Sequence, residues 1–402
     1  MRENGRADFD ASFPEHPVTP PLTIPLLVPD LPSLQELLPY FQRIEDNRHY
    51  SNFGPLVAEL ETRIAQRFTS SGGGCMHAVT TSSATTAIEI ALQSLALPAG
   101  APVLVPAFGF AAAASVVQKL GHALHFMDVD AARWECTPAI ARQMMAAVRP
   151  AAVIVISPFG YPVDPLGWDE LAAQTGVPVI IDAAAGFGNQ QVSSGVATIF
   201  SMHATKAFGA GEGGVVVVSD ADAAHHLRRI SNFGFQDRVA QHAGTNAKLS
   251  EWHAAVALAQ LARMDDVIRS RRQVLAGYQE EFAGYSQLAW HPDAFTAAVP
   301  AFMPVAAPDR DSARALVAGL AAAGIDSRTW FAPALTLHPA FAAAAARRNG
   351  PPMLAESLAE RIVCLPFHAN LTQHDIAYIA RTTRDSLDRH LAGADCQART
   401  AG

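Results

Sequence analysis

Short apolar runs without polar alternation recur between residues 76 and 220, and alanine-rich stretches separate them. Strands that are apolar on both faces are typical of parallel sheets that helices cover on each side. The runs comprise residues 103–105, 124–127, 153–156, 177–182, 199–201 and 215–219. This pattern predicts an α/β fold with a large, mostly parallel sheet.

Helical spacing of apolar residues precedes the region of apolar runs. Ser33 and Glu36 form a capping-box signature at the start of one helix. Pro55 suits the first turn of a second helix, which runs to about Phe68. Two helices are therefore expected before the first strand.

The pattern changes after residue 250. Residues 250–282 carry an apolar stripe and predict one long helix that leads out of the sheet. Strand-like runs at 301–305 and 362–366 follow, together with a helix capped by Thr372 and Asp375. These elements predict a smaller α+β domain at the C-terminal end.

Composition agrees with two domains. The 402 residues are 50% hydrophobic and 16% charged, which is enough apolar surface for a large core. We expect a flexible arm over residues 1–20, a large domain over 21–270 and a small domain over 271–402. No apolar run approaches the roughly 18 residues that a membrane helix needs, and the N-terminus lacks the apolar core of a signal peptide. A cytoplasmic protein fits these features.

Charge and cysteine content narrow the possible functions. The formal net charge of -8 argues against a nucleic-acid surface. The four cysteines lie far apart without a Cys-x-x-Cys pair, so neither a disulfide framework nor a zinc site is predicted. The histidines show no ligand spacing supported by nearby acids, and we expect no metal.

Candidate chemistry lies between residues 180 and 219. Asp182 ends one buried run, Lys206 follows the next, and the glycine-rich run 209–214 leads into a third. Ligands of open α/β sheets collect at the carboxyl ends of strands, so Asp182 and Lys206 are predicted to face one crevice. Taken singly, an aspartate after a buried strand is as often a helix cap as a functional acid, and most lysines are solvated surface charges. The glycine run matches Gly-x-Gly-x-x-Gly, but it precedes a strand, whereas a dinucleotide fingerprint follows one.

Further motifs stand in collinear order between about residues 30 and 385. They are Ser-Ala-Thr at 83–85, Val-Pro-Ala-Phe-Gly-Phe at 105–110, Asp-Ala-Ala at 182–184, Ser-x-His-Ala-Thr-Lys at 201–206, Gly-Glu-Gly-Gly at 211–214, Asn-Phe-Gly-Phe at 232–235, Gly-Thr-Asn-Ala-Lys-Leu-Ser-Glu at 244–251 and Leu-Pro-Phe-His at 365–368. The ordered set resembles the nucleotide-sugar aminotransferase family (DegT/StrS type) of fold-type-I enzymes that use pyridoxal 5'-phosphate (PLP). The resemblance implies an aspartate-aminotransferase-like fold.

The resemblance implies that Lys206 carries the cofactor as a Schiff base and that Asp182 pairs with its pyridine nitrogen. A carboxylate at that place keeps the nitrogen protonated, which makes the ring an electron sink. A lysine whose pKa is lowered by burial and by a cationic cofactor can serve as a nucleophile and then as a proton carrier. Both implied roles are therefore physically sound.

The resemblance also implies how the cofactor phosphate is held. Ser83, Ala84 and Thr85 precede a helix expected over residues 86–97, whose first amides and dipole favour an anion. The alternative explanation of these residues is a simple N-cap. Ser201 is implied as a further phosphate ligand.

Two more contacts follow from the resemblance. Phe110 matches an aromatic residue that stacks on the pyridine ring, although a Phe beside an alanine-rich run is more often part of a core. Asn246 matches a residue that reaches the phosphate of the neighbouring subunit. A homodimer with shared active sites is therefore expected.

Three positions depart from the family pattern. Ala185 stands where His or Gln usually contacts the phenolic oxygen of the cofactor. Ala84 replaces the glycine of the phosphate loop, and Gly109 replaces Ser or Thr before the stacking aromatic. These departures leave PLP binding expected and bear mainly on the reaction.

The Asn-Phe-Gly-Phe and Asn-Ala-Lys-Leu-Ser-Glu variants resemble the branch that aminates keto-6-deoxyhexoses on a nucleoside diphosphate. We predict transfer of an amino group, from L-glutamate, to C3 or C4 of such a sugar, as in deoxyamino sugar synthesis for cell-surface polysaccharides. One alternative is a PLP-dependent sugar dehydratase or lyase, which Lys206 disfavours because the dehydratase branch has histidine there. Another is a catalytically silent protein that binds a partner or regulates, for which Ala185 is the only support.

Overall fold

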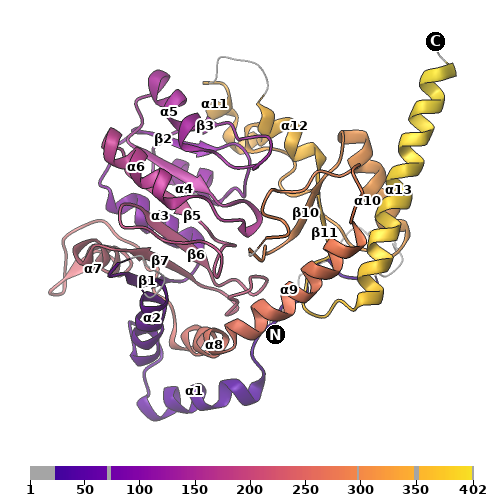
Figure 1. Cartoon of the computed structure of the whole chain (residues 1–402). Coiled ribbons are helices and arrows are strands. Elements are labelled where there is room, and N and C mark those ends of the chain that lie inside the picture. The colour runs from indigo at the N-terminus through magenta and orange to yellow at the C-terminus, as the bar shows by residue number, and fades with distance from the viewer. Residues whose placement is uncertain (1–22, 70–73, 297, 348–352, 401–402) are drawn as a thin grey trace, which may run out of the picture.

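A seven-stranded sheet forms the centre of the larger part of the molecule (Figure 1). The computed structural model describes residues 23–69, 74–296, 298–347 and 353–400, so the predicted arm over residues 1–20 lies outside the described residues. The strands are β1 (His77–Thr81), β2 (Pro102–Pro106), β3 (Ala123–Met127), β4 (Ala152–Ile156), β5 (Val179–Asp182), β6 (Ala197–Ser201) and β7 (Gly214–Val218). Their order across the sheet is β1-β7-β6-β5-β4-β2-β3.

The sheet is mostly parallel, as predicted. Pairing is parallel from β3 through β2, β4 and β5 to β6, whereas β7 runs antiparallel to both β6 and β1. Each apolar run of the sequence corresponds to a strand. The edge strand β1 was not predicted, because its apolar residues are interrupted by threonines that are nevertheless fully buried.

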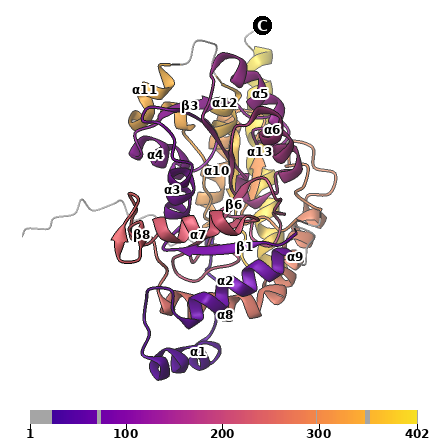
Figure 2. The same ribbon diagram turned by 90° about the vertical axis from the view of Figure 1, so that its left-hand side faces the viewer.

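Both faces of the sheet are buried under helices, which explains the absence of polar alternation. On β5, Ile180 belongs to one hydrophobic core and Ile181 to the other. Figure 2 shows α3 (Ala84–Ser94) and α4 (Ala112–Lys119) on one side and α5 (Pro138–Ala147) and α6 (Pro165–Thr175) on the other. The remaining helices of this part are α1 (Leu34–Asn47), α2 (Pro55–Phe68), α7 (Ala221–Ile230), α8 (Glu251–Ala262) and α9 (Met264–Glu281).

Local signals at the helix ends were partly predictive. Ser33 and Glu36 form the expected capping box of α1, and Pro55 begins α2. The helix expected over residues 86–97 is wrong at both ends, because Ser83 is the N-cap, the helix begins at Ala84 and it ends at Ser94.

The single helix expected over residues 250–282 is also wrong. Two helices, α8 and α9, meet at Arg263, which caps both. The apolar stripe continues across the junction since Leu258 on α8 and Met264 on α9 pack into the same core. A continuous stripe therefore could not reveal the break.

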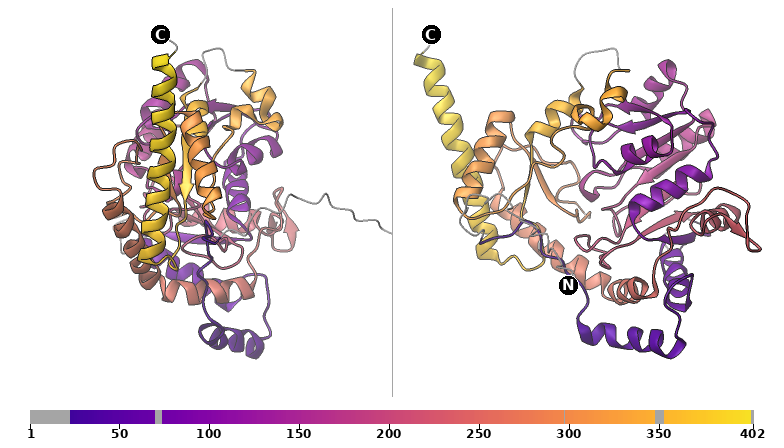
Figure 3. Two further views of the ribbon diagram at one scale, coloured as in Figure 1. Left: turned by 90° about the vertical axis from the view of Figure 1, so that its right-hand side faces the viewer. Right: turned by 180° about the vertical axis from the view of Figure 1, so that it is seen from behind.

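A second, smaller unit packs around a two-stranded antiparallel sheet of β10 (Met303–Ala306) and β11 (Ile362–Leu365) (Figure 3). Its helices include α10 (Arg310–Ala322), α12 (Leu354–Arg361) and α13 (Gln373–Thr400), the last begun by the predicted cap of Thr372 and Asp375. This is the smaller α+β unit that the sequence predicts. The short helix α11 (Ala342–Ala345) instead packs against β3 of the large sheet. Helix α9 joins the two units, because its start packs into the large core and its end into a separate core of the smaller unit.

The described residues contain neither a membrane-spanning helix nor a cluster of metal ligands. No helix among them is long and apolar enough to cross a membrane. Within the same residues, no group of three or more His, Cys, Asp and Glu side chains is arranged to hold a metal ion.

Candidate active site

A cavity of about 540 Å³ lies where β4, β5 and β6 end, and the smaller unit contributes part of its wall. We call it the central pocket. Its lining residues are Leu26, Leu27, Ser83, Ala84, Thr85, Ile88, Phe110, Ala112, Ile156, Ser157, Phe159, Asp182, Ala184, Ala185, Ser201, His203, Thr205, Lys206, Glu212, Phe302, Asp326, Arg328, Trp330 and Phe331. The carboxyl ends of parallel strands therefore form the cavity, as expected for an open α/β sheet.

Asp182 and Lys206 both line the central pocket. Asp182 is the last residue of β5, and its Oδ1 accepts a hydrogen bond from the Ala184 amide at 3.1 Å. Lys206 follows β6, and its Nζ lies 4.9 Å from the centre of the Phe302 ring. The structure thus brings together the acid and the amine that the sequence singled out.

Burial controls the ionisation of both groups. It raises the pKa of Asp182 to about 6, although the Ala184 amide and the charge of Lys206 act in the opposite direction. Burial also lowers the pKa of Lys206 to about 8, with Asp182 opposing that change and Arg271 adding to it. A large fraction of Lys206 is therefore an uncharged amine near pH 8, which is the nucleophilic form.

The amino end of α3 forms another wall of the central pocket. Ser83, Ala84, Thr85 and Ser201 all line the cavity. The Ser83 Oγ accepts a hydrogen bond from the Thr86 amide at 3.1 Å, so the N-cap explanation of Ser83 is correct. The cap and an anion site are compatible, because the helix dipole favours negative charge beside the first turn.

Phe110 and Ala185 also reach the cavity. The Phe110 side chain is 69% exposed, so it is not a core residue of this chain. Gly109 before it has φ +156°, and a Cβ there would lie 2.5 Å from the Ile156 Cδ1. A side chain at position 109 would therefore need Ile156 to move.

Asn246 does not line the central pocket of its own chain. It is exposed and forms an isolated antiparallel bridge with Asn232. Nearby lies the hairpin of β8 (Phe235–Gln236) and β9 (Val239–Ala240), which is exposed as well. The predicted contact of Asn246 with a neighbouring subunit stays a prediction.

Sequence reasoning missed much of the aromatic and charged wall. Phe159, Phe302, Trp330 and Phe331 line the cavity, with Phe159 stacked on Phe331 at 5.1 Å between ring centres. Arg328 lies beside Trp330, 5.9 Å from the guanidinium carbon to the ring centre. No local motif marks these residues. Phe159 follows β4 in the large unit, whereas the others approach Lys206 only through the packing of the two units.

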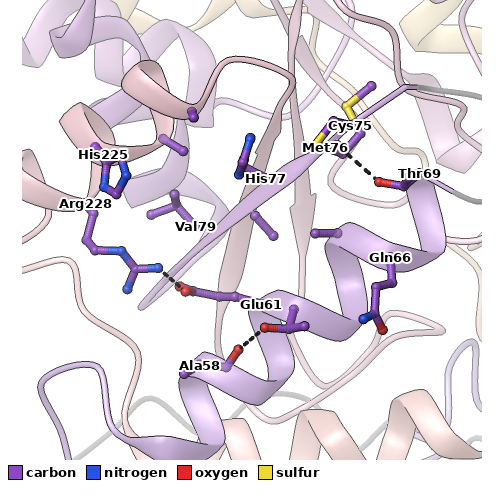
Figure 4. Close-up of a pocket in the computed structure, with 15 residues that line it drawn as sticks. Ala58, Glu61, Gln66, Thr69, Cys75, Met76, His77, Val79, His225 and Arg228 are labelled. Carbon is purple, nitrogen blue, oxygen red and sulfur yellow. Dashed lines mark hydrogen bonds and ion pairs between the residues drawn. The ribbon is translucent and has the colours of Figure 1, made fainter.

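A second cavity of about 570 Å³ lies outside the sheet, beside β1, α2 and α7 (Figure 4). Its buried acid, Glu61, accepts hydrogen bonds from the Thr80 amide and hydroxyl at 2.8 and 2.9 Å. Glu61 also pairs with Arg228, as Figure 4 shows. These contacts satisfy the Glu61 carboxylate and hold α2 and α7 against the edge strand. The buried acid of this cavity therefore has a structural role.

A model of the DegT/DnrJ/EryC1/StrS aminotransferase family matches residues 34–384. The chain belongs to this family. The match includes every lining residue of the central pocket except Leu26 and Leu27, and therefore Lys206, Asp182 and the residues contributed by the smaller unit.

Individual family members are similar over most of their length. The chain is 30% identical to protein Rv3402c of Mycobacterium tuberculosis strain H37Rv, with 90% of each chain covered. It is 32% identical to the UDP-N-acetyl-3-dehydro-alpha-D-glucosamine 3-aminotransferase of Acidithiobacillus ferrooxidans, over 78% of this chain and 85% of that one. The crystal structure of DesI with its TDP-sugar product has a TM-score of 0.80 and 29% identity, over 95% of this chain and 97% of that chain.

Proposed function

We propose that this family member is a PLP-dependent aminotransferase that transfers an amino group, from L-glutamate, to a nucleotide-linked 3- or 4-keto-6-deoxy sugar. The observation that carries the proposal is the placement of Lys206 and Asp182 in one cavity at the amino end of α3. The names of two relatives, a UDP-sugar aminotransferase and a protein crystallised with a TDP-sugar product, support the substrate class. A structure from Bacillus cereus assigned as a PLP-dependent aminotransferase, 25% identical with a TM-score of 0.81, supports the cofactor; it covers 90% of this chain and 99% of that chain.

The residues present fit PLP. Lys206 offers an amine whose pKa is lowered to about 8, and Asp182 offers a buried carboxylate in the same cavity. Thr85, Ser201 and the first amides of α3 offer donors for a phosphate. When bound, the cofactor supplies an electron sink for the carbon that gains or loses the amino group.

The protein side chains then have separate tasks. The Asp182 carboxylate holds a proton on the pyridine nitrogen, because a negative charge there stabilises the cationic ring. The Lys206 amine would hold the cofactor through its nucleophilic nitrogen, and the same side chain would move a proton at the substrate carbon. The aromatic wall of Phe159, Phe302, Trp330 and Phe331 limits the access of water to the reacting centre.

The position of Arg328 supports the proposal that the substrate is anionic. Its side chain is exposed to the central pocket, and its described interaction is with the Trp330 ring. A guanidinium is suited to bidentate contacts with carboxylate or phosphate oxygens. Both the amino donor and a nucleoside diphosphate carry such groups.

A shared active site in a cytoplasmic homodimer is part of the proposal. Asn246 is exposed and lies away from the pocket of its own chain, as a residue that serves a partner must. The nearby Phe233, Phe235 and Val239 are 45%, 42% and 55% exposed, which favours a protein contact at this face.

The activity is tested with purified protein, PLP, L-glutamate and a nucleoside-diphosphate-linked 4-keto-6-deoxyhexose. We expect 2-oxoglutarate and an amino sugar in equal amounts by mass spectrometry, and neither product from Lys206→Ala. Lys119→Ala is the matched control, because Lys119 is a surface residue paired with Glu89 at 2.8 Å. Loss of water from the sugar without 2-oxoglutarate would indicate a lyase, and failure to bind PLP would indicate a silent protein.

A further inference from the structure

Arg271 is a buried cation on α9, where that helix passes from the large unit to the smaller one. The residue is 5% exposed. Its Nη2 donates hydrogen bonds to the carbonyl oxygens of Pro300 and Ala301 at 3.3 and 2.9 Å. The guanidinium carbon lies 4.7 Å from the centre of the Phe367 ring. Arg271 therefore fixes the backbone at residues 300–301.

The charge of Arg271 has no paired carboxylate among the described side chains. Asp30, whose charge raises the pKa of Arg271, is itself paired with Arg263 at 2.8 Å. Burial outweighs Asp30 and lowers the pKa of Arg271 to about 10, so the group stays charged at neutral pH. His368 lies close enough for the Arg271 charge to lower its pKa, to which burial contributes most. A buried charge without an opposite charge beside it is unfavourable. Groups with strongly shifted pKa values are concentrated at functional sites.

The backbone that Arg271 holds leads directly to Lys206. Phe302 follows Ala301, and its ring lies 4.9 Å from the Lys206 Nζ. The Ala301 amide also donates to the Phe159 carbonyl oxygen at 2.8 Å, so the segment is held from two sides. Two charged groups act on Lys206 besides burial: Asp182 from β5 and Arg271 from α9.

We propose that Arg271 is a positioning residue for Lys206: it anchors the backbone that places the Phe302 ring beside the Lys206 amine, and its buried positive charge acts on the same amine in the opposite sense to the ring. Arg271 does not line the central pocket, so it acts through Phe302 and through its electric field rather than by touching substrate. This inference deepens the proposed function, since it rests on Lys206 as the reacting lysine.

The sequence makes a direct test possible because it contains three lysines, Lys119, Lys206 and Lys248. Reductive methylation of the cofactor-free full chain with ¹³C-formaldehyde gives few NMR signals, and Lys206→Ala assigns the relevant one. The titration midpoint of Lys206 is then compared in the wild type and in three variants. They are Arg271→Gln, which removes the charge and keeps an amide donor, Arg271→Lys, which keeps the charge, and Phe302→Leu.

Arg271→Gln is expected to raise the Lys206 midpoint, because a nearby positive charge disfavours the ammonium form. Arg271→Lys should leave the midpoint near that of the wild type. Phe302→Leu should lower it, since the ring face stabilises an ammonium group. An unchanged midpoint in Arg271→Gln, or an equal rise in Arg271→Lys, would overturn the proposal.

Phe302→Leu keeps the proposal falsifiable if the Arg271 variants accumulate poorly, because it tests the contact through which the anchored backbone reaches Lys206. It alters neither the charge nor the backbone anchor, and a raised midpoint there would contradict the geometry. The titration does not require bound cofactor. A cofactor found on another lysine would therefore refute the proposed function while leaving the measured effect of Arg271 intact.

Discussion

The substitution Asp182→Asn is expected to increase the stability of the fold and to decrease turnover. Burial raises the Asp182 pKa from 3.8 to about 6 in the folded chain without cofactor. The ionised carboxylate therefore destabilises the fold above pH 6, by about 3 kcal/mol for a difference of roughly two pKa units. Because the folded pKa is raised, the favourable contribution of the protonated acid is complete below about pH 4 and is lost as the pH rises to 6. Asn mimics the protonated acid and can keep the hydrogen bond from the Ala184 amide.

Denaturant unfolding of the cofactor-free proteins measures this difference. We expect Asp182→Asn to be more stable than the wild type by up to about 3 kcal/mol at pH 8, with the gain vanishing near pH 4. The same variant should retain some PLP and lose most of its turnover, because an amide cannot hold a proton on the pyridine nitrogen. A gain of equal size at both pH values would refute the electrostatic reasoning. Near-normal turnover would remove Asp182 from the mechanism.

Three further predictions concern neighbouring features. Mixing the Lys206→Ala and Asn246→Ala proteins should restore about a quarter of the wild-type number of active sites after random subunit exchange. The reason is that one of the two sites of each heterodimer carries neither lesion. A fully active monomer in sedimentation would exclude shared active sites. Ala185→His should shift the pH at which the absorbance of bound cofactor changes, since position 185 lines the cavity, and an unchanged titration would show that it does not face the cofactor. Gly160→Ala should destabilise the fold by about 1–3 kcal/mol in denaturant unfolding, because Gly160 has φ +89° and a Cβ there would lie 2.5 Å from the Ala185 carbonyl oxygen; unaltered stability would contradict that geometry.

The sequence predicted elements whose signals are local. Apolar runs buried on both faces identified six strands, and the Ser33 and Thr372 caps identified two helix starts. Lys206 and Asp182 were found because each follows or ends such a run. Those two residues and the amino end of α3 meet in one pocket because parallel strands share one carboxyl edge.

Features that depend on packing between distant segments escaped prediction. The break at Arg263 leaves the apolar stripe intact, and β1 is buried despite its threonines. Arg328 and Trp330 enter the pocket from the smaller unit, more than a hundred residues after Lys206 in the chain. Their position follows from how the two units pack around α9, which no local pattern encodes.

Borohydride reduction followed by peptide mapping tests the central claim most directly. The full-length protein is incubated with PLP, reduced, digested and examined by mass spectrometry for a pyridoxyl group on each of its three lysines. We predict the adduct on Lys206 and its loss in Lys206→Ala, with Lys119 and Lys248 unmodified. An adduct on Lys119 or Lys248 in place of Lys206, or none in a protein that retains its fold, would contradict the assignment of the site.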